Sequence, residues 1–342
     1  MEHNEDLDFL KGIGIVLVVL GHCFTTALET KYYSISLLKD FIYTFHMPLF
    51  FIVSGYLQGL RPYRIDKLRK LSTYQIRKLF LPYIAWSLVL YIFYYFLSSI
   101  NIITIQENIR LNPIYLIYDI LAFNIRTGNV LWFVYILCII SIVSYIFHNL
   151  ITRRGSNIAF LIAVFFLGIL ANIYLRDELF VLKRFLVMWI YYEVGAFIGI
   201  YIKDINIKAN STVNIILLAL YPLIYILYFK TNSIIAYGLK VICALSAVFI
   251  LYSLSKFSNS WLYRILNYLG KQTSYIYYLH NPYIVLVLVT GLTKFTKLNI
   301  AVSIAVAFIF GIIIPLIIGN LILARNKMTK LILLGERYEK QY

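Results

Sequence analysis

The chain has 342 residues, of which 61% are hydrophobic and 13% are charged, and its mean hydropathy is +0.81. Soluble domains are about half apolar and about a quarter charged, so this composition excludes a soluble fold. The formal net charge is +16. In so apolar a chain, lysines and arginines in cytoplasmic loops next to anionic membrane lipids explain this excess better than nucleic-acid binding does.

The apolar stretches predict an all-α, polytopic membrane protein with about ten transmembrane helices in a single domain, 1–342. One crossing takes about 20 apolar residues. Acidic residues precede the first stretch, so we expect a helix that stays in the protein and not a cleaved signal peptide. The three cysteines have no metal-ligand spacing, and no metal site is expected. The predicted spans are 8–28, 37–60, 77–99, 129–149, 156–174, 181–202, 211–229, 234–256, 273–293 and 300–323.

Basic residues between the second and third spans set the expected orientation. Seven lie between Arg61 and Lys78, and the positive-inside bias places this loop and both termini in the cytoplasm. Such a cluster usually serves topology and lipid head groups, but a polyanionic donor from the cytoplasm can also dock there. The candidate residues for docking are Arg64, Arg69, Arg77 and Lys78.

The first span carries Lys11 and His22. At about 100° and about 1.5 Å per residue, they share one helix face and lie about 16 Å apart along the axis. A cation near the cytoplasmic surface and an imidazole beyond the bilayer centre suit a long ligand that is anionic at one end and reactive at the other, such as coenzyme A. The alternative is structural: Lys11 pairs with Asp8, and His22 hydrogen-bonds a neighbouring helix.

The second span carries His46 at about the depth of His22, because the two helices are antiparallel. Two imidazoles at one level are candidates for a proton-transfer pair. Ser54, Gly55 and Tyr56 lie further in. Small residues in membrane helices usually serve close packing, so packing explains Ser54 at least as well as a role in binding does.

Further candidates lie outside the first two spans. An ionisable residue inside a membrane span is costly and therefore a functional candidate. Glu193 is expected either to be protonated and hydrogen-bonded or to be functional. His280 is expected in the cytoplasmic half of the ninth span, and Trp132 is expected to anchor the membrane interface. Arg126, in the outer loop 100–128, is a candidate acceptor contact, with a mobile surface connection as the alternative.

Several segments resemble the acyltransferase 3 family of integral membrane proteins, most closely its fucose 4-O-acetylase-like branch. The segments 7–22 and 45–57 are the most specific to the family, and the detailed resemblance covers about the first quarter of the chain. The segments are LDFLKGIGIVLVVLGH (7–22), FHMPLFFIVSGYL (45–57), IRKLFLPYIAW (76–86), LWF (131–133) and, more loosely, YIYYLH (275–280).

The resemblance implies transfer of an acyl group, commonly acetyl from acetyl-CoA, to a hydroxyl of a cell-envelope carbohydrate at the bacterial cytoplasmic membrane. The family's basic residue and histidine in the first helix fall on Lys11 and His22, with Lys where many members have Arg. The family's Ser-Gly-Phe/Tyr signature falls on residues 54–56. The basic residue before its Leu-Pro-Tyr motif falls on Arg77.

We therefore predict that His22 is the catalytic imidazole. It acts either as a general base on the acceptor hydroxyl or as the carrier of the acyl group, and the sequence leaves both open. His46 is expected to orient His22 or to handle the second proton, and the acyl-CoA phosphates are expected at Lys11, Arg77 and neighbouring basic residues. The main rival function is a transporter or flippase for a glycan or lipid-linked intermediate, and a third is a membrane scaffold.

Overall fold

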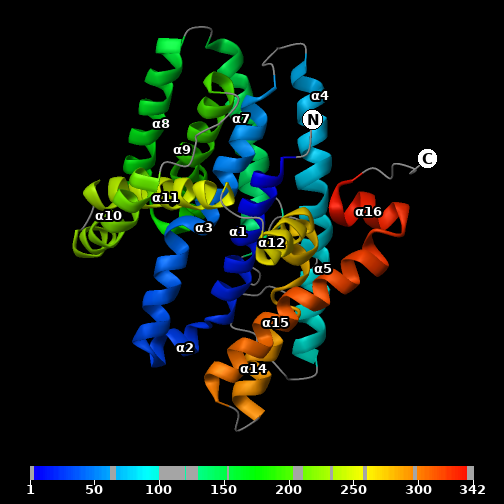
Figure 1. Cartoon of the computed structure of the whole chain (residues 1–342). Coiled ribbons are helices and arrows are strands. Elements are labelled where there is room, and N and C mark those ends of the chain that lie inside the picture. Colours follow the sequence, from blue (N-terminus) through cyan, green and yellow to red (C-terminus); the bar gives the residue numbers. More distant parts are fainter. Residues whose placement is uncertain are drawn as a thin grey trace.

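The computed structural model describes residues 4–61, 67–99, 120, 130–151, 154–202, 211–231, 234–256, 260–295 and 299–336. These residues form helices, with no strand among them (Figure 1). The elements are α1 (Glu5–Cys23), α2 (Thr26–Lys31), α3 (Tyr33–Gly59), α4 (Leu68–Gln75), η2 (Ile76–Phe80), α5 (Leu81–Ser99), α7 (Trp132–Leu150), α8 (Arg154–Tyr174), η3 (Asp177–Leu179), α9 (Phe180–Tyr201), α10 (Ser211–Lys230), α11 (Ile234–Ser255), α12 (Trp261–Lys271), α13 (Thr273–Leu279), α14 (Val285–Phe295), α15 (Ile300–Ile318), η4 (Gly319–Leu323) and α16 (Lys327–Leu334).

Seven helical stretches in the described ranges are long and apolar enough to cross a membrane. They coincide with the second to fifth, seventh, eighth and tenth predicted spans. The first and sixth predicted spans are the continuous helices α1 and α9, of 19 and 22 residues, which carry more charged side chains. The chain is an all-α polytopic membrane protein, as the hydropathy pattern predicts.

The ninth predicted span differs from the expectation of one continuous helix. It is two helices, α13 and α14, separated by residues 280–284. Pro282 explains the break, because a proline lacks a backbone donor and the residue before it avoids helical angles. The second helix restarts with the Val285 N–H bonded to the His280 carbonyl at 2.8 Å. The break places His280 at a chain interruption inside the protein.

Helices α3 and α9 cross at backbone contact. Gly55 and Gly59 on α3 face Gly195 and Gly199 on α9. A methyl group on any of the four would overlap a backbone carbonyl of the opposite helix. Glycines spaced in this way let membrane helices approach closely where little hydrophobic effect drives them together. The close approach expected at Gly55 is therefore present.

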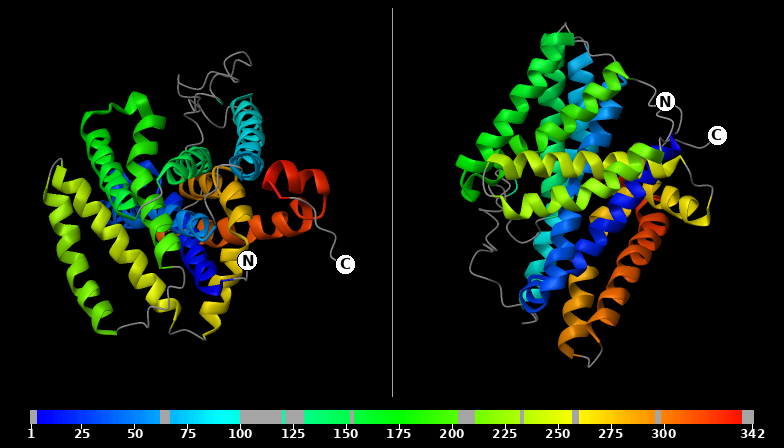
Figure 2. Two further views of the ribbon diagram at one scale, coloured as in Figure 1. Left: turned by 90° about the horizontal axis from the view of Figure 1, so that it is seen from above. Right: turned by 60° about the vertical axis from the view of Figure 1, so that its left-hand side comes forward.

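Helix α1 lies in the middle of the molecule and contacts α3, α11, α12, α13, α14 and α15. Its contact with α12 is also at backbone distance: a side chain on Gly12 would overlap the Leu266 carbonyl, and one on Gly270 the Asp8 carbonyl. In both panels of Figure 2, α10 and α11 lie beside each other at one flank of the molecule. The surroundings of α1 thus decide which side chains meet His22.

Candidate active site

His22 and His280 form the centre of the candidate site. His22 lies in the last turn of α1, and His280 is fully buried at the break between α13 and α14. Their ring centres are 5.2 Å apart, with the ring planes at 53°. We expected His280 nearer the cytoplasm than His22. That expectation is wrong, because the contact between the two rings places them at one level.

The hydrogen bonds of His280 fix its protonation pattern. Its Nδ1 lies 2.8 Å from the Ile276 carbonyl oxygen and 2.9 Å from that of Tyr277. A carbonyl oxygen only accepts, so Nδ1 carries the proton and the lone pair resides on Nε2. Nε2 is buried and has no hydrogen-bond partner among the described residues. His280 therefore holds a buried, unused basic nitrogen beside His22.

His46 is arranged in the same way on α3. It is buried, its Nδ1 donates to the Ile42 carbonyl at 2.8 Å, and its ring stacks on Tyr43 at 4.6 Å. His46 and His280 both lie close enough to His22 for the charges of the three rings to interact. The sequence indicated the pair His22 and His46, whereas the ring in contact with His22 is that of His280.

Arg77 lies in the π-helical turn η2, just before α5. Pro82 follows this turn and cannot donate an ordinary helical hydrogen bond, which accounts for the local widening of the helix. The guanidinium carbon of Arg77 lies 5.7 Å from the centre of the Tyr74 ring, and its Nε is buried without a partner among the described residues. Arg77 thus has an N–H group available to an anion.

The neighbouring basic residues differ in how far they are engaged. Lys78 is paired with Glu336 at 2.6 Å, whereas Arg69 on α4 is exposed. Lys11 is paired with Asp8 at 2.6 Å, which is the structural alternative considered for it. Arg64 lies outside the described residues. Arg77 and Arg69 therefore remain the better placed cations for phosphate.

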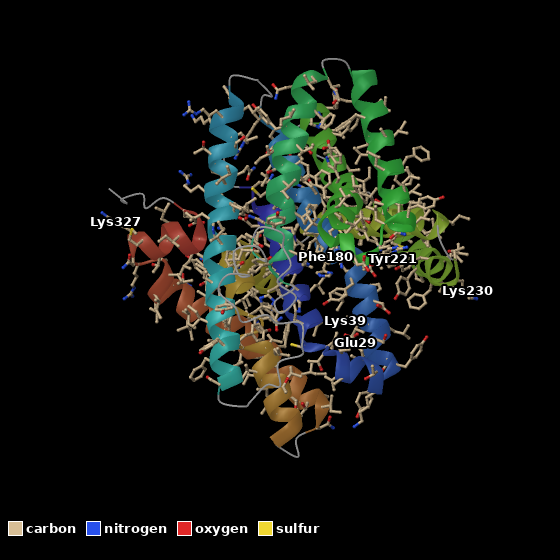
Figure 3. All side chains as sticks on the ribbon, turned by 180° about the vertical axis from the view of Figure 1, so that it is seen from behind. Glu29, Lys39, Phe180, Tyr221, Lys230 and Lys327 are labelled. Carbon is tan, nitrogen blue, oxygen red and sulfur yellow. The ribbon has the colours of Figure 1, made fainter. Side chains whose placement is uncertain are left out.

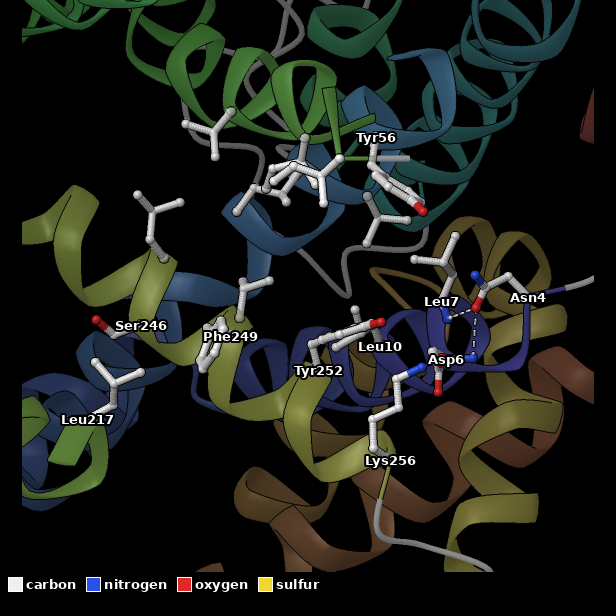
Figure 4. A pocket seen from close by; sticks show the side chains of 17 residues that line it. Asn4, Asp6, Leu7, Leu10, Tyr56, Leu217, Ser246, Phe249, Tyr252 and Lys256 are labelled. Atoms are coloured by element: carbon white, nitrogen blue, oxygen red, sulfur yellow. Dashed lines mark hydrogen bonds and ion pairs between the residues drawn. The ribbon is translucent and has the colours of Figure 1, made fainter. Parts of the chain in front are cut away.

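The segment Ser54 to Tyr56 divides between packing and a pocket. Ser54 is half-buried, and Gly55 serves the contact with α9. Tyr56 is buried and lines a pocket of about 670 Å³ between α1, α3, α9 and α11 (Figure 4). Most of the residues that line this pocket are apolar.

The cation at this pocket is already engaged. Lys256 reaches the Asp6 carboxylate beside Leu7, as Figure 4 shows. Burial lowers the pKa of Lys256, but hydrogen bonds with Asp6 and Tyr252 outweigh this effect and raise that pKa above its ordinary value. The pocket thus suits a hydrocarbon chain better than a polyphosphate.

A separate polar network surrounds Glu193 inside the bundle of α7, α8 and α9. The Oε1 atom of Glu193 accepts hydrogen bonds from Ser144 and, at 2.7 Å, from the Trp189 indole; its Oε2 lies 2.7 Å from the Nε2 of His148. The Nδ1 of His148 lies 2.9 Å from Asn157 Oδ1. Glu193 is hydrogen-bonded, which is one part of the first expectation for it. The ring in contact with His22 is that of His280, which is not part of this network.

Comparison with known proteins places the chain in a family. Residues 4–323 match the model of a family described as an acyltransferase domain, the acyltransferase 3 family. The chain belongs to this family. This is the family that the segments around His22 and Ser54 resemble.

The acyltransferase also matches a curated relative over a shorter stretch. Nodulation protein NolL of Sinorhizobium fredii is 38% identical over 88 residues. These residues are 25% of this chain and 24% of NolL, so the match spans about a quarter of that relative's length. No solved structure gives a significant match.

Trp132 of the acyltransferase is not an exposed interfacial anchor. It is buried, stacks on Phe51 and lies under the guanidinium of Arg184, whose carbon is 4.9 Å from the ring centre. Arg184 also lies 5.2 Å from the Phe180 ring. A half-buried arginine close to the centres of two aromatic rings is a cation–π arrangement. The sequence reasoning passed over Arg184.

The remaining expectations concern the outer loop and metal ions. Arg126 lies outside the described residues. In the described part of the chain, no three His, Cys, Asp or Glu side chains are grouped so that they could hold a metal ion.

At the α2–α3 corner, Lys39 pairs with Glu29 and donates to the Phe24 carbonyl at 2.8 Å, next to the end of α1 (Figure 3).

Proposed function

We propose that this acyltransferase moves an acetyl group, or another acyl group, from cytoplasmic acyl-CoA to a hydroxyl of a cell-envelope carbohydrate in the bacterial cytoplasmic membrane. The observation that carries the proposal is the contact of His22 with His280, whose Nε2 is buried, basic and unpartnered among the described residues. Proton transfer by a positioned imidazole is a common means of activating a hydroxyl.

The proposed reaction uses the imidazoles to carry one proton. His22 takes the proton of the acceptor hydroxyl while the hydroxyl oxygen bonds to the thioester carbonyl carbon. The carbon–sulfur bond then breaks, and the coenzyme A thiolate takes the proton from the imidazolium. His280, with its lone pair on Nε2, holds His22 in the required orientation or shares that proton; His46 supports His22 from the α3 side.

An acyl-histidine is the alternative course for the same residues. A nitrogen of His22 then bonds first to the thioester carbonyl carbon, the carbon–sulfur bond breaks, and coenzyme A leaves as its thiol with the imidazole proton. In the second step the acceptor hydroxyl oxygen bonds to the acyl carbon, the carbon–nitrogen bond breaks, and the released imidazole nitrogen takes the hydroxyl proton. A single round with labelled acyl-CoA and no acceptor distinguishes the two courses, because only the second leaves label on the protein.

The donor's phosphates are proposed to bind on the cytoplasmic side at Arg77 and Arg69. Arg77 supports this by its buried, unpaired Nε, and Arg69 by its exposure on α4. Lys11 and Lys78 make weaker candidates, because each is paired with a carboxylate. The apolar pocket that Tyr56 lines is proposed to bind a hydrocarbon chain of the substrate or of a membrane lipid.

Two measurements test the function. Mass spectrometry of surface polysaccharides from cells with and without the protein should show the loss of one acetyl mass per modified unit. The purified protein in lipid vesicles should release free coenzyme A from acetyl-CoA when de-O-acetylated polysaccharide from the same cells is added. Glycan movement across the vesicle without release of coenzyme A would instead indicate a flippase.

A further inference from the structure

A second pocket, of about 360 Å³, lies where four helix ends meet. Its lining comes from the N-terminal parts of α3 and α11 and the last turns of α8 and α10. The predicted topology places all four of these ends on the outer side of the membrane. Pockets of about 300–1,000 Å³ are typical of small-ligand sites. The pocket therefore lies on the side opposite the predicted donor entry.

Four polar side chains in this pocket have unused hydrogen-bonding capacity. They are Asp40, Asn172, Tyr228 and Lys240. None of them makes a side-chain hydrogen bond or ion pair with another described residue. By contrast, the hydroxyl of Tyr237, which also lines the pocket, donates to the Val187 carbonyl at 3.1 Å.

Helix α3 connects the pocket with the histidines. Asp40, which lines the pocket, precedes His46 by six residues on this helix, or about 9 Å along its axis. Lys240 lies within electrostatic range of both Asp40 and His46. A molecule that is bound against Asp40 and extends along α3 therefore reaches toward His46.

The mixture of groups indicates an uncharged polyol. A carboxylate such as Asp40 only accepts hydrogen bonds, an ammonium such as Lys240 only donates them, and the Asn172 amide and Tyr228 hydroxyl do both. Sugar hydroxyls likewise donate and accept, and the rings of Tyr228 and Phe229 offer apolar faces to the C–H groups of a sugar. Asp40 would repel the carboxylate of an acidic sugar and Lys240 would attract it, so the pair gives that charge no net compensation for the loss of its hydration.

We propose that this pocket binds a neutral sugar unit of the acceptor and presents a neighbouring hydroxyl to His22. The inference rests on the proposed function and adds to it the place and the charge of the acceptor. Because the charges of Lys240 and Asp40 offset each other, the pocket is expected to favour a neutral sugar over a uronic acid.

The test compares Lys240→Met with Lys230→Met in the full-length protein in lipid vesicles. Lys230 is the last residue of α10, is exposed and does not line the pocket (Figure 3). With de-O-acetylated native polysaccharide as acceptor, Lys240→Met should raise the acceptor KM about tenfold. The acetyl-CoA KM and the slow hydrolysis of acetyl-CoA without acceptor should change less than about twofold.

Three results would overturn the proposal: an unchanged acceptor KM in Lys240→Met, an equal rise of that KM in Lys230→Met, or an acceptor KM in Lys240→Arg as high as in Lys240→Met. Methyl glycosides of neutral hexoses should compete with the polysaccharide better than those of the matching uronic acids, and the opposite order would also overturn it. If the wild-type protein shows no acetyl transfer, the proposed acyltransferase function is wrong. If the wild type transfers acetyl but the Lys240 variants behave like the wild type, only the proposed sugar site is wrong.

Discussion

Two buried histidines of this acyltransferase lie in opposite surroundings. Both ring nitrogens of His148 have partners, Glu193 and Asn157. His280 has partners at Nδ1 alone, and its Nε2 is buried beside His22 with none in the described part of the chain. A buried polar atom without a partner costs about 1–3 kcal/mol. Packing therefore explains the satisfied histidine, while the unsatisfied one points to a partner that binds during the reaction.

The comparison makes the two regions separable by experiment. Changes around His22 and His280 should lower acyl transfer in a protein that stays folded. Changes around His148 and Glu193 should lower stability, and the protein that remains folded should keep its activity.

Replacing His22 by alanine should have the largest effect. Removal of a general acid or base typically lowers the rate about 10²–10⁴-fold. His22 is half-buried at the end of α1, so the loss of its ring leaves the helix intact. The kcat of labelled acetyl transfer, corrected for the amount of protein in the membrane, checks this. Activity above about a tenth of the wild type would contradict the assignment.

Replacing Glu193 by alanine should cost about 3–5 kcal/mol, because it removes the buried carboxylate that His148 Nε2, the Ser144 hydroxyl and the Trp189 indole share, and leaves the indole only Ser144 Oγ at 2.9 Å. Glu193→Gln is the matched control. Its carbonyl oxygen can still accept from Ser144 and Trp189, and its amide can donate to a neutral His148. Thermal unfolding in detergent should therefore show a large drop in Tm for the alanine variant and a small one for the glutamine variant.

Acetyl transfer per folded molecule should stay within about twofold of the wild type in both Glu193 variants. A loss of kcat in Glu193→Gln at an unchanged Tm would give this network a catalytic role, and the contrast between the two histidines would no longer hold.

Replacing His280 tests which of its nitrogens matters. Asparagine can place an N–H near Nδ1 and keep the bond to the Ile276 carbonyl while removing Nε2; glutamine can place a polar atom near Nε2. His280→Asn should therefore lower kcat about 100-fold with little change in Tm, and His280→Gln should retain more of the activity. Equal losses in the two variants would show that His280 only packs.

Much of the fold was predictable from hydropathy and charge, and the part that was not depends on local chain breaks. The length of the apolar stretches, about 20 residues for each crossing, located α3, α7, α8 and α11 to within a few residues. The ninth span was predicted as one helix because the stretch 273–293 as a whole is apolar enough to cross a membrane. The dipeptide Asn281-Pro282 nevertheless interrupts the helix. That dipeptide was the available signal, and it decides where His280 lies.

The sequence indicated His22, His46 and His280 as candidates, but it did not predict that the rings of His22 and His280 are in contact. Lys11 and His22 share a helix face, which follows from spacing alone, but which ring meets His22 depends on how α1 and α13 pack. Partners far apart in sequence leave no periodic trace. For the same reason His148 was overlooked, because nothing near it in the sequence indicates that Glu193 lies 2.7 Å away.

The smallest expected change is in the acetyl-CoA KM, and it shows whether Arg77 or Lys11 binds the phosphates of the donor. The Nε of Arg77 is buried and unpaired among the described residues, whereas the Lys11 ammonium lies 2.6 Å from Asp8. Arg77→Gln should raise the acetyl-CoA KM about tenfold, or about 1.4 kcal/mol, with kcat little changed. The double variant Lys11→Met with Asp8→Asn removes the ion pair without leaving a buried charge, and it should change that KM less than about threefold. A larger rise of the acetyl-CoA KM in the double variant than in Arg77→Gln would place the phosphates at α1. Lys11 would then have to leave the Asp8 carboxylate in order to bind the donor.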